Sequence, residues 1–195
     1  MRIRLLVPAL AAVAAVALVT LASPVAPRAG AAPESWRVDP AHSFLLFRHD
    51  HMGAGTIHGR FNSFEGTVSF DAQNPSASTV SVEVKTESVD TGNAGRDEHL
   101  RKPDFFDTTQ FPTMSFKSTS VKGSAKALEV TGDLTMHGVT KPVTVKLNVR
   151  GPVDFMSKKH IGFEGSFEID RIDWKIGKAQ GDTKVGITLS IECDK

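Results

Sequence analysis

The chain has 195 residues and a formal net charge of +1, with charges of both signs interleaved along its length. Such a nearly neutral surface offers no positive cluster for nucleic acid or an anionic membrane, so we expect no nucleic-acid partner. The single cysteine, Cys193, excludes an intrachain disulfide. Because Cys193 continues an alternating apolar run, we predict a buried and inert thiol, and we leave a homodimer open.

The first 31 residues have the pattern of a secretory signal peptide. Arg2 and Arg4 precede an apolar run, and Ala29 and Ala31 are the small residues that a signal peptidase reads. An uncleaved membrane anchor is the alternative, because the run approaches the ~20 residues that span a bilayer. The pattern predicts a signal peptide at 1–31, export to the periplasm or the extracellular space, and a mature domain at 32–195. Without residues 1–31, 20 basic and 22 acidic residues remain, a net charge of −2.

From Trp36 onward, apolar and polar residues alternate in short runs, as in strands with one buried face and one wet face. Buried parallel strands would be apolar on both faces, so the pattern predicts an antiparallel sheet. We expect one all-β domain of about eight strands, arranged as a sandwich or a closed barrel. The runs are 44–49, 57–61, 64–70, 80–85, 114–116, 130–136, 143–149, 163–169 and 185–191.

Two features of these runs favour a barrel with space inside it. Glycines occupy the apolar phase of several runs, where each either leaves space or lets the strand bend sharply. The chain also has 12 Phe and no Tyr, so its aromatic rings need no hydroxyl partner in a dry interior. A packed Phe-rich core would look the same, and an eight-stranded barrel can be filled or can hold one small ligand. The glycines are Gly59, Gly66, Gly132 and Gly165.

Residues 96–107 interrupt the alternation with clustered charges, a proline and two adjacent phenylalanines. Thr91 or Asn93 can cap a short helix near residues 93–102, and Pro103 would end it. The segment is either a connecting helix anchored on the barrel or a lid across the barrel's mouth, and composition does not choose between them. Its apolar anchors are Leu100, Phe105 and Phe106.

The histidines offer the one opening toward metal chemistry. His49 and His51 are two residues apart, so on a strand they would project from one face, which is an acceptable start for a metal site. No further ligand completes a recognised spacing, and no Gly-x-Ser-x-Gly elbow accompanies the serines. The residues therefore give no positive case for an enzyme, and we expect no catalytic residue, metal or cofactor. A metal-dependent enzyme with His49 and His51 as ligands stays the alternative.

Several separated motifs follow one another along the chain. They are Asp39-Pro40-Ala41-His42-Ser43, Gly59-Arg60-Phe61, Phe64-Glu65-Gly66, Thr91-Gly92-Asn93, Arg96-Asp97-x-His99-Leu100, Asp104-Phe105-Phe106-Asp107, Phe111-Pro112, Gly132-Asp133-Leu134-Thr135, His137-Gly138-Val139-Thr140-Lys141-Pro142 and Arg171-Ile172-Asp173-Trp174. With these motifs in this order, the sequence from about Trp36 to Glu192 resembles the YceI-like family of exported lipid-binding proteins. His49 departs from the aliphatic residue expected at its position, and Trp174 stands where Phe is commoner.

The resemblance implies a single antiparallel, lipocalin-like β-barrel with a short helical segment and a long apolar pocket. It also implies an exported binding protein whose partner is a long apolar lipid of the polyisoprenoid, isoprenoid quinone or fatty acyl type. Family folds host different ligands, so the identity of the lipid does not follow. We expect the inward phase of the strands to line the pocket, with two phenylalanines near the entrance. The lining residues are Leu45, Phe47, Phe61, Val82, Val84, Leu134, Val145, Leu147, Phe163, Phe167 and Leu189, and the entrance residues are Phe105 and Phe106.

Overall fold

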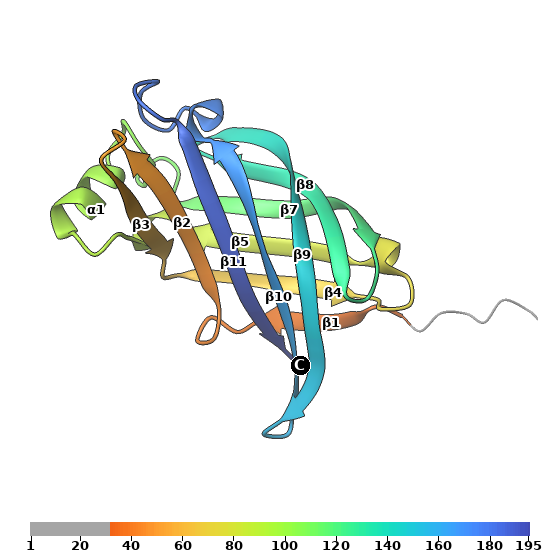
Figure 1. The fold of residues 1–195 in the computed structure, drawn as a ribbon. Helices are drawn as coiled ribbons and strands as arrows, with labels where there is room; N and C mark the ends of the chain where they lie inside the picture. Colours follow the sequence, from red (N-terminus) through yellow and green to blue (C-terminus); the bar gives the residue numbers. More distant parts are fainter. Residues whose placement is uncertain (1–31) are drawn as a thin grey trace, which may run out of the picture.

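The computed structural model describes residues 32–195, so the expected signal peptide at 1–31 lies outside the described residues (Figure 1). In the described part, eleven strands form one continuous antiparallel sheet. The strands are β1 (Glu34–Val38), β2 (Phe44–His51), β3 (Gly55–Phe61), β4 (Phe64–Phe70), β5 (Thr79–Lys85), β6 (Val89–Asp90), β7 (Thr113–Gly123), β8 (Ala127–Met136), β9 (Val139–Phe155), β10 (Lys158–Asp170) and β11 (Lys184–Asp194). The helical elements are α1 (Ala94–Leu100) and the 3₁₀ turns η1 (Pro75–Ala77), η2 (Thr86–Ser88) and η3 (Arg171–Trp174).

The sheet closes on itself as an eight-stranded barrel. Its strand order is β1-β4-β5-β7-β8-β9-β10-β11, and β1 pairs with β11 to complete the ring. Three further strands extend from the ring, because β2 also pairs with β11, β3 with β2 and β6 with β3. In Figure 1 the strands β4, β5 and β7 pass behind β9, β10 and β11 at a steep angle. The predicted antiparallel barrel of about eight strands is confirmed.

A single strand, β11, serves as partner to both β1 and β2, and the turn between those two strands makes this sharing possible. β1 ends its pairing at Val38 and β2 begins at Phe44. In between, the backbone N–H of Asp39 donates to the carbonyl of Glu192 over 2.8 Å. The hydroxyl of Ser43 then donates to the same carbonyl and accepts from the N–H of Glu192. The buried hydroxyl of Ser43 therefore bonds the N–H and the carbonyl of Glu192 at a position of β11 that pairs with neither β1 nor β2.

At the inward glycines, groups of the neighbouring strand come close. This closeness decides whether the glycines leave space inside the barrel or let the strands bend. A Cβ added at Gly165 would lie 2.1 Å from the carbonyl oxygen of Lys146 on the next strand. At Gly59 it would lie 2.2 Å from the ring of Phe47, which covers the glycine from β2. Gly66 and Gly132 are also covered by backbone oxygens of the adjoining strand. The glycines thus permit bending and close approach and do not themselves create the space inside the barrel.

One end of the barrel is filled by side chains. Trp36, Ile161 and Cys193 are among its most deeply buried residues, and Ile161 and Cys193 face each other across β10 and β11. Burial in this apolar environment raises the pKa of the Cys193 thiol to about 12, which favours the unreactive protonated form. The expectation of a buried thiol is confirmed. Over residues 32–195, the one α-helix is far shorter than a bilayer-crossing helix would need to be.

The helix α1 begins and ends close to the expected positions. The side-chain oxygen of Asn93 accepts from the N–H of Arg96 over 3.0 Å, so Asn93 and not Thr91 is the N-cap. The helix ends at Leu100, and turns carry the chain past Pro103 toward β7. The short helical segment expected near 93–102 is therefore present, and it is two residues shorter at its C-terminal end.

Candidate functional site

The barrel encloses a cavity of about 470 Å³ with almost entirely apolar walls. Volumes of ~300–1,000 Å³ are typical of small-molecule sites. All thirteen residues expected to line the pocket or its entrance border this cavity, while their contact with a ligand stays a prediction. They are Leu45, Phe47, Phe61, Val82, Val84, Phe105, Phe106, Leu134, Val145, Leu147, Phe163, Phe167 and Leu189.

The inward side chains of β11 show that the cavity is a space and not a packed core. Val185, Ile187, Leu189 and Ile191 alternate on one face and all border the cavity, yet each is only half-buried. In a filled interior such residues would be covered by side chains from the opposite wall. Their remaining exposure instead faces the cavity. The open question of a hollow or a filled barrel is answered in favour of a hollow one.

Aromatic rings form a continuous surface from the wall of the cavity to residues 101–107. Phe47 on β2 contacts Phe61 on β3, with ring centroids 5.7 Å apart. Phe61 in turn meets the edge of Phe106 at 5.5 Å. Edge-to-face and tilted pairs of this kind are favourable arrangements of aromatic rings. Phe106 therefore belongs to the cavity wall as well as to the segment that interrupts the alternating strands.

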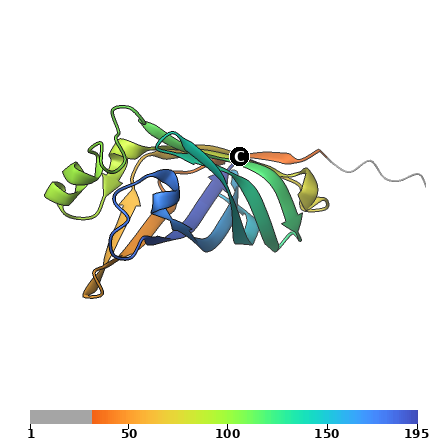
Figure 2. The same cartoon turned by 90° about the horizontal axis from the view of Figure 1, so that it is seen from above.

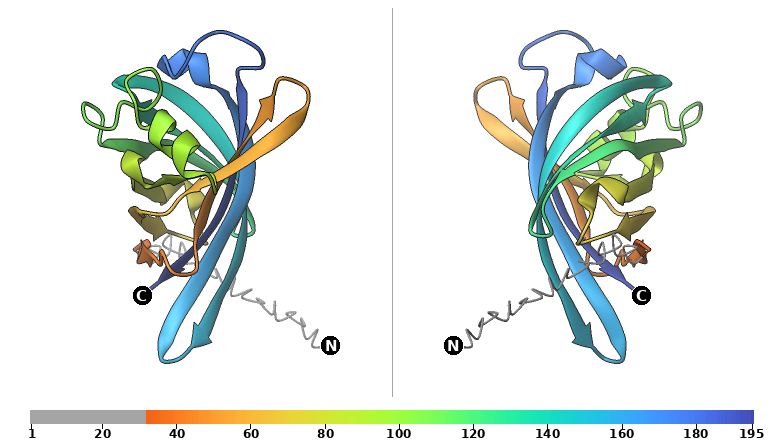
Figure 3. Two further views of the ribbon diagram at one scale, coloured as in Figure 1. Left: turned by 90° about the vertical axis from the view of Figure 1, so that its left-hand side faces the viewer. Right: turned by 90° about the vertical axis from the view of Figure 1, so that its right-hand side faces the viewer.

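The cavity extends toward the end of the barrel where α1 lies. Figure 3 (left) looks onto this end, where α1, the β2–β3 hairpin and the segment from η3 to β11 surround the barrel axis. Each of them contributes side chains to the lining: Arg96 and Leu100 from α1, Ile57 from β3 and Arg171 from η3. We call this end the mouth. Figure 2 shows the β2–β3 hairpin projecting away from the remainder of the barrel at the same end.

Residues 94–107 are tied to their surroundings by several hydrogen bonds. The guanidinium of Arg101 donates to the carbonyls of Glu87 and Val89 over 2.8 and 2.9 Å. The buried carboxylate of Asp97 accepts from the N–H of Thr91 over 2.8 Å. Beyond the helix, the N–H of Gly177 donates to the carbonyl of Asp104 over 2.9 Å. The segment is therefore an anchored connection whose Leu100, Phe105 and Phe106 border the cavity at its mouth.

Polar residues in the lining are few, and sequence analysis did not assign most of them to the cavity. They are His49, His51, Ser78, Arg96, His99, Ser115 and Arg171. The three-residue spacing of Arg96 and His99 places them on one face of the predicted helix, so their mutual proximity could have been inferred. Nothing in the sequence pattern indicates that Arg171, 75 residues later, borders the same cavity.

His49 and His51 both border the cavity from β2, as expected for residues two apart on a strand. The imidazole Nδ1 of His49 lies 3.0 Å from the carbonyl oxygen of Lys184. Within residues 32–195, neither histidine belongs to a group of three His, Cys, Asp or Glu side chains close enough to share a metal ion. The metal-dependent alternative therefore lacks a third ligand from this part of the chain.

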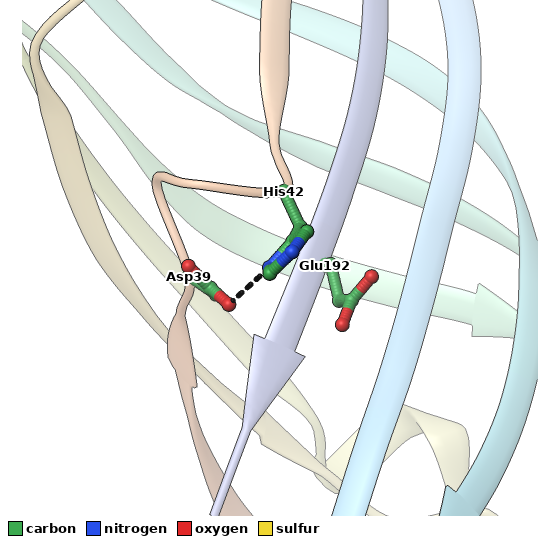
Figure 4. Close-up of side chains that lie close together, drawn as sticks. All are labelled: Asp39, His42 and Glu192. Carbon is green, nitrogen blue, oxygen red and sulfur yellow. Dashed lines mark hydrogen bonds and ion pairs between the residues drawn. The ribbon is translucent and has the colours of Figure 1, made fainter. Parts of the chain in front are cut away.

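One such group lies elsewhere, beside the turn between β1 and β2, and Figure 4 shows it. The imidazole of His42 is 2.8 Å from the carboxylate of Asp39, and Glu192 is engaged with His160 at 2.9 Å. The hydrogen bond between His42 and Asp39 raises the pKa of His42 and lowers the pKa of Asp39. A metal ligand must be a neutral imidazole, which a raised pKa disfavours. We interpret the pair as part of the turn.

A closed antiparallel barrel with an apolar cavity and a mouth at one end is the architecture of a small-molecule binding protein of the lipocalin-like type. The YceI-like domain family matches residues 36–194, so the chain belongs to this family. Protein YceI of Shigella flexneri is 43% identical over 154 residues, which cover 77% of this chain and 81% of the relative. A UPF0312 protein of Pseudomonas aeruginosa is 42% identical over the same shares.

Solved structures share the fold. BcnA of Burkholderia cenocepacia is similar with a TM-score of 0.71 at 22% identity, over 80% of this chain and 98% of BcnA. The YceI protein of Campylobacter jejuni has a TM-score of 0.68 at 25% identity, over 75% and 90% of the two chains. A polyisoprenoid binding domain from Saccharophagus degradans has a TM-score of 0.65 at 17% identity, over 82% and 97%. These matches agree with the barrel assigned from the sequence.

Proposed function

We propose that this protein is an exported binding protein that holds one long apolar lipid inside its barrel. The observation that carries the proposal is the apolar cavity of about 470 Å³, which extends toward the mouth. The opposite end of the barrel is filled by side chains. Membership of the YceI-like family supports a lipid, and the solved domain from Saccharophagus degradans, described as polyisoprenoid binding, has a similar fold. A polyisoprenoid, an isoprenoid quinone or a fatty acyl compound would each suit such walls.

The walls can supply affinity without many polar contacts. Burial of a methylene-sized unit contributes about 0.8 kcal/mol, so a long chain gains from each unit that enters the cavity. Most of the lining residues lie on strands of a closed antiparallel ring, so little of this gain is lost in ordering the site. The thirteen residues expected at the cavity and its entrance are our candidates for contact with the chain of the lipid.

Mass spectrometry of an organic extract tests the binding proposal. Protein purified from its own host should yield an isoprenoid, quinone or fatty acyl compound in roughly stoichiometric amount. An extract without any such compound, from protein whose barrel is folded, would refute the proposal. Elemental analysis of the same preparation addresses the enzyme alternative, because a stoichiometric metal that disappears in a His49→Ala variant would favour a metal-dependent enzyme.

Export is a separate part of the proposal, and it rests on residues 1–31 of the sequence. If Ala29 and Ala31 guide cleavage, the intact mass of the mature protein should place the new N-terminus at Ala32, within a residue or two. Recovery of the full-length chain in the membrane fraction would instead support the anchor.

A further inference from the structure

Exposed apolar side chains gather at the turn between β9 and β10. Within residues 32–195, six large apolar side chains are exposed, and three of them lie within four consecutive positions. They are Val153, Phe155 and Met156, which expose 58%, 62% and 82% of their surface. We call residues 153–156 the tip. A cluster of this kind on a protein surface commonly marks a site of interaction.

The tip projects beyond the ring of strands. The ladder between β9 and β8 ends at Asn148, so the last residues of β9 pair with β10 alone. β10 pairs with β11 from His160 onward, and Lys159 exchanges two backbone hydrogen bonds with Lys195 at the end of the chain. Figures 1 and 3 show the β9–β10 hairpin extending past the neighbouring strands. The tip is therefore a narrow, convex projection.

The turn at the tip places a methionine in a backbone conformation that suits glycine or asparagine. Met156 and Ser157 have φ angles of 46° and 66°, and they join the two strands as a two-residue loop. Such loops favour Asn-Gly, because most side chains are strained in the left-handed region. The exposed Met156 gains little packing in return. The stability of the hairpin therefore does not account for a methionine at this position.

Charges beside the tip are balanced within the fold, with three basic residues against three acidic ones. No net positive patch is left to attract anionic lipid or an acidic partner. Burial of the apolar side chains is then the interaction that the tip can offer. The ion pairs are Arg150 with Glu164 and Lys158 with Asp194, and Lys159 lies opposite Asp154 in the β9–β10 ladder.

The size and shape of the tip favour a lipid surface over a second copy of the chain. A stable protein interface buries ~800 Å² on each partner and involves about 20–30 residues a side. A convex tip with three apolar side chains offers far less than this. The headgroup region of a bilayer closes around a small projection and accepts apolar side chains to a depth of ~5–10 Å.

The chain outside the described residues joins the barrel close to the tip. Glu34 in β1 forms an ion pair with Lys195 over 2.7 Å, and Lys195 is hydrogen-bonded to the backbone of Lys159. The apolar run of the expected signal peptide ends near Ala22, and residues 23–33 span at most ~40 Å. On either expectation, cleaved signal peptide or retained anchor, the run would enter a membrane from this end of the barrel.

The tip and the mouth lie at opposite ends of β10. The strand runs from Lys158 beside the tip to Asp170, and Arg171 then borders the cavity at the mouth. Its 13 residues correspond to a separation of about 40 Å along the strand. We propose that the tip enters the surface of a lipid bilayer through Val153, Phe155 and Met156. The barrel then stands on the membrane by its filled end and holds its mouth away from the bilayer.

Co-sedimentation of the mature protein with extruded vesicles tests this inference. The wild type should bind vesicles of pure phosphatidylcholine. Binding should change little at high salt, or when a third of the lipid is anionic phosphatidylglycerol, because apolar burial does not depend on charge. The double variant Phe155→Ser, Met156→Ser should show a partition coefficient lower by about tenfold or more.

Met52→Ser is the matched control for the double variant. Met52 exposes 81% of its surface and has a φ angle of 60°, so it resembles Met156 in both respects. It lies in the β2–β3 turn on the side of the mouth and does not border the cavity. The Met52→Ser variant should bind vesicles like the wild type, and thermal melts show whether each variant is folded.

Fluorescence locates the contact directly. A tryptophan in the Phe155→Trp variant should shift its emission to the blue on addition of vesicles, and brominated phosphatidylcholine should quench it. A tryptophan in the Met52→Trp variant should show neither effect. The native Trp36 and Trp174 are buried and supply a constant background.

Three results would overturn the inference. The first is a wild type that does not bind vesicles, or binds only anionic ones and dissociates at high salt. The second is loss of binding in the Met52→Ser variant with binding kept in the double variant, which would place the contact at the mouth. The third is a double variant that changes a wild-type dimer into a monomer and still binds vesicles, which would make the tip an interface between copies. None of these results bears on a lipid inside the cavity, which extraction tests separately.

Discussion

Two valines on β9 offer a direct test of whether the barrel is hollow in solution. Val145 exposes 5% of its surface and borders the cavity, whereas Val149 exposes 6% and does not border it. They lie four residues apart on one strand, so both side chains point into the barrel. Val149 pairs with Phe163 in β10. Replacing each by Trp makes the same chemical change with and without free space next to it.

The expected magnitudes differ for this reason. At Val149 the indole has no room, and overpacking of a core costs about 1–3 kcal/mol. For a domain of this size, that corresponds to a decrease in Tm of ~2–12 °C. At Val145 the indole enters a cavity of about 470 Å³ and gains apolar burial. The ligand-free Val145→Trp variant should therefore melt within ~2 °C of the wild type, or above it.

Thermal melts of delipidated proteins by circular dichroism measure these shifts, and lipid titrations complete the comparison. The Val145→Trp variant should bind lipid more weakly, because the indole occupies space that the lipid would use. The Val149→Trp variant, where it stays folded, should keep its affinity. If the ligand-free Val145→Trp variant loses as much stability as the Val149→Trp variant, the interior is filled in solution. The lipid-binding site would then have to be assigned to another part of the protein.

Further predictions concern the bends, the turn and the thiol. Gly165→Ala should lower the free energy of unfolding by about 1–3 kcal/mol, because its Cβ would meet a backbone oxygen at 2.1 Å. Gly162→Ala in the same strand, with its nearest atom at 3.5 Å, should change stability far less in denaturant titrations. His42 has a raised pKa and its partner Asp39 a lowered one, so the pair stabilises the fold most between about pH 4 and 6.5. The stability gained from His42 is lost as pH rises through its folded pKa. The His42→Ala variant should therefore lose less Tm than the wild type between pH 5.5 and 8. An equal loss of Tm in both proteins would contradict a stabilising interaction between His42 and Asp39. Cys193, with a pKa of about 12, should react with a thiol reagent at pH 8 only after unfolding, and rapid labelling of native protein would refute its burial.

The alternation of apolar residues was enough to predict an antiparallel sheet and its inward residues, whereas the choice of a barrel over a sandwich rested on the glycines, the phenylalanines and the family resemblance. Strand register has a period of two, so a residue such as Leu189 is assigned to the interior once its neighbours in phase are apolar. This reasoning placed the eleven expected strand residues at the cavity, whereas Phe105 and Phe106 belong to the segment that interrupts the alternation. It could not decide between a bend and a cavity at Gly59 or Gly165, because that depends on how closely the adjoining strand approaches.

The polar end of the site was less accessible to sequence analysis. Arg96 and Arg171 lie in helical turns on segments far apart in the chain, and their proximity to one cavity follows from how those segments fold over the mouth. Alternation carries no information about such segments. The role of Ser43 was likewise hidden, because its two hydrogen bonds to Glu192 depend on β1 and β2 sharing a partner strand.

The position of β11 in the ring has a consequence for the order of folding events. This strand follows every other strand in the chain, and it pairs with β10, β1 and β2. A chain synthesised or transported from its N-terminus therefore presents β1 and β2 long before their common partner arrives. Closing so long a loop is entropically costly, and contacts between distant residues form slowly. The topology thus delays ring closure until residues 184–194 are available, so β1 and the outer edge of β2 stay without their common partner until the last strand of the chain has been made.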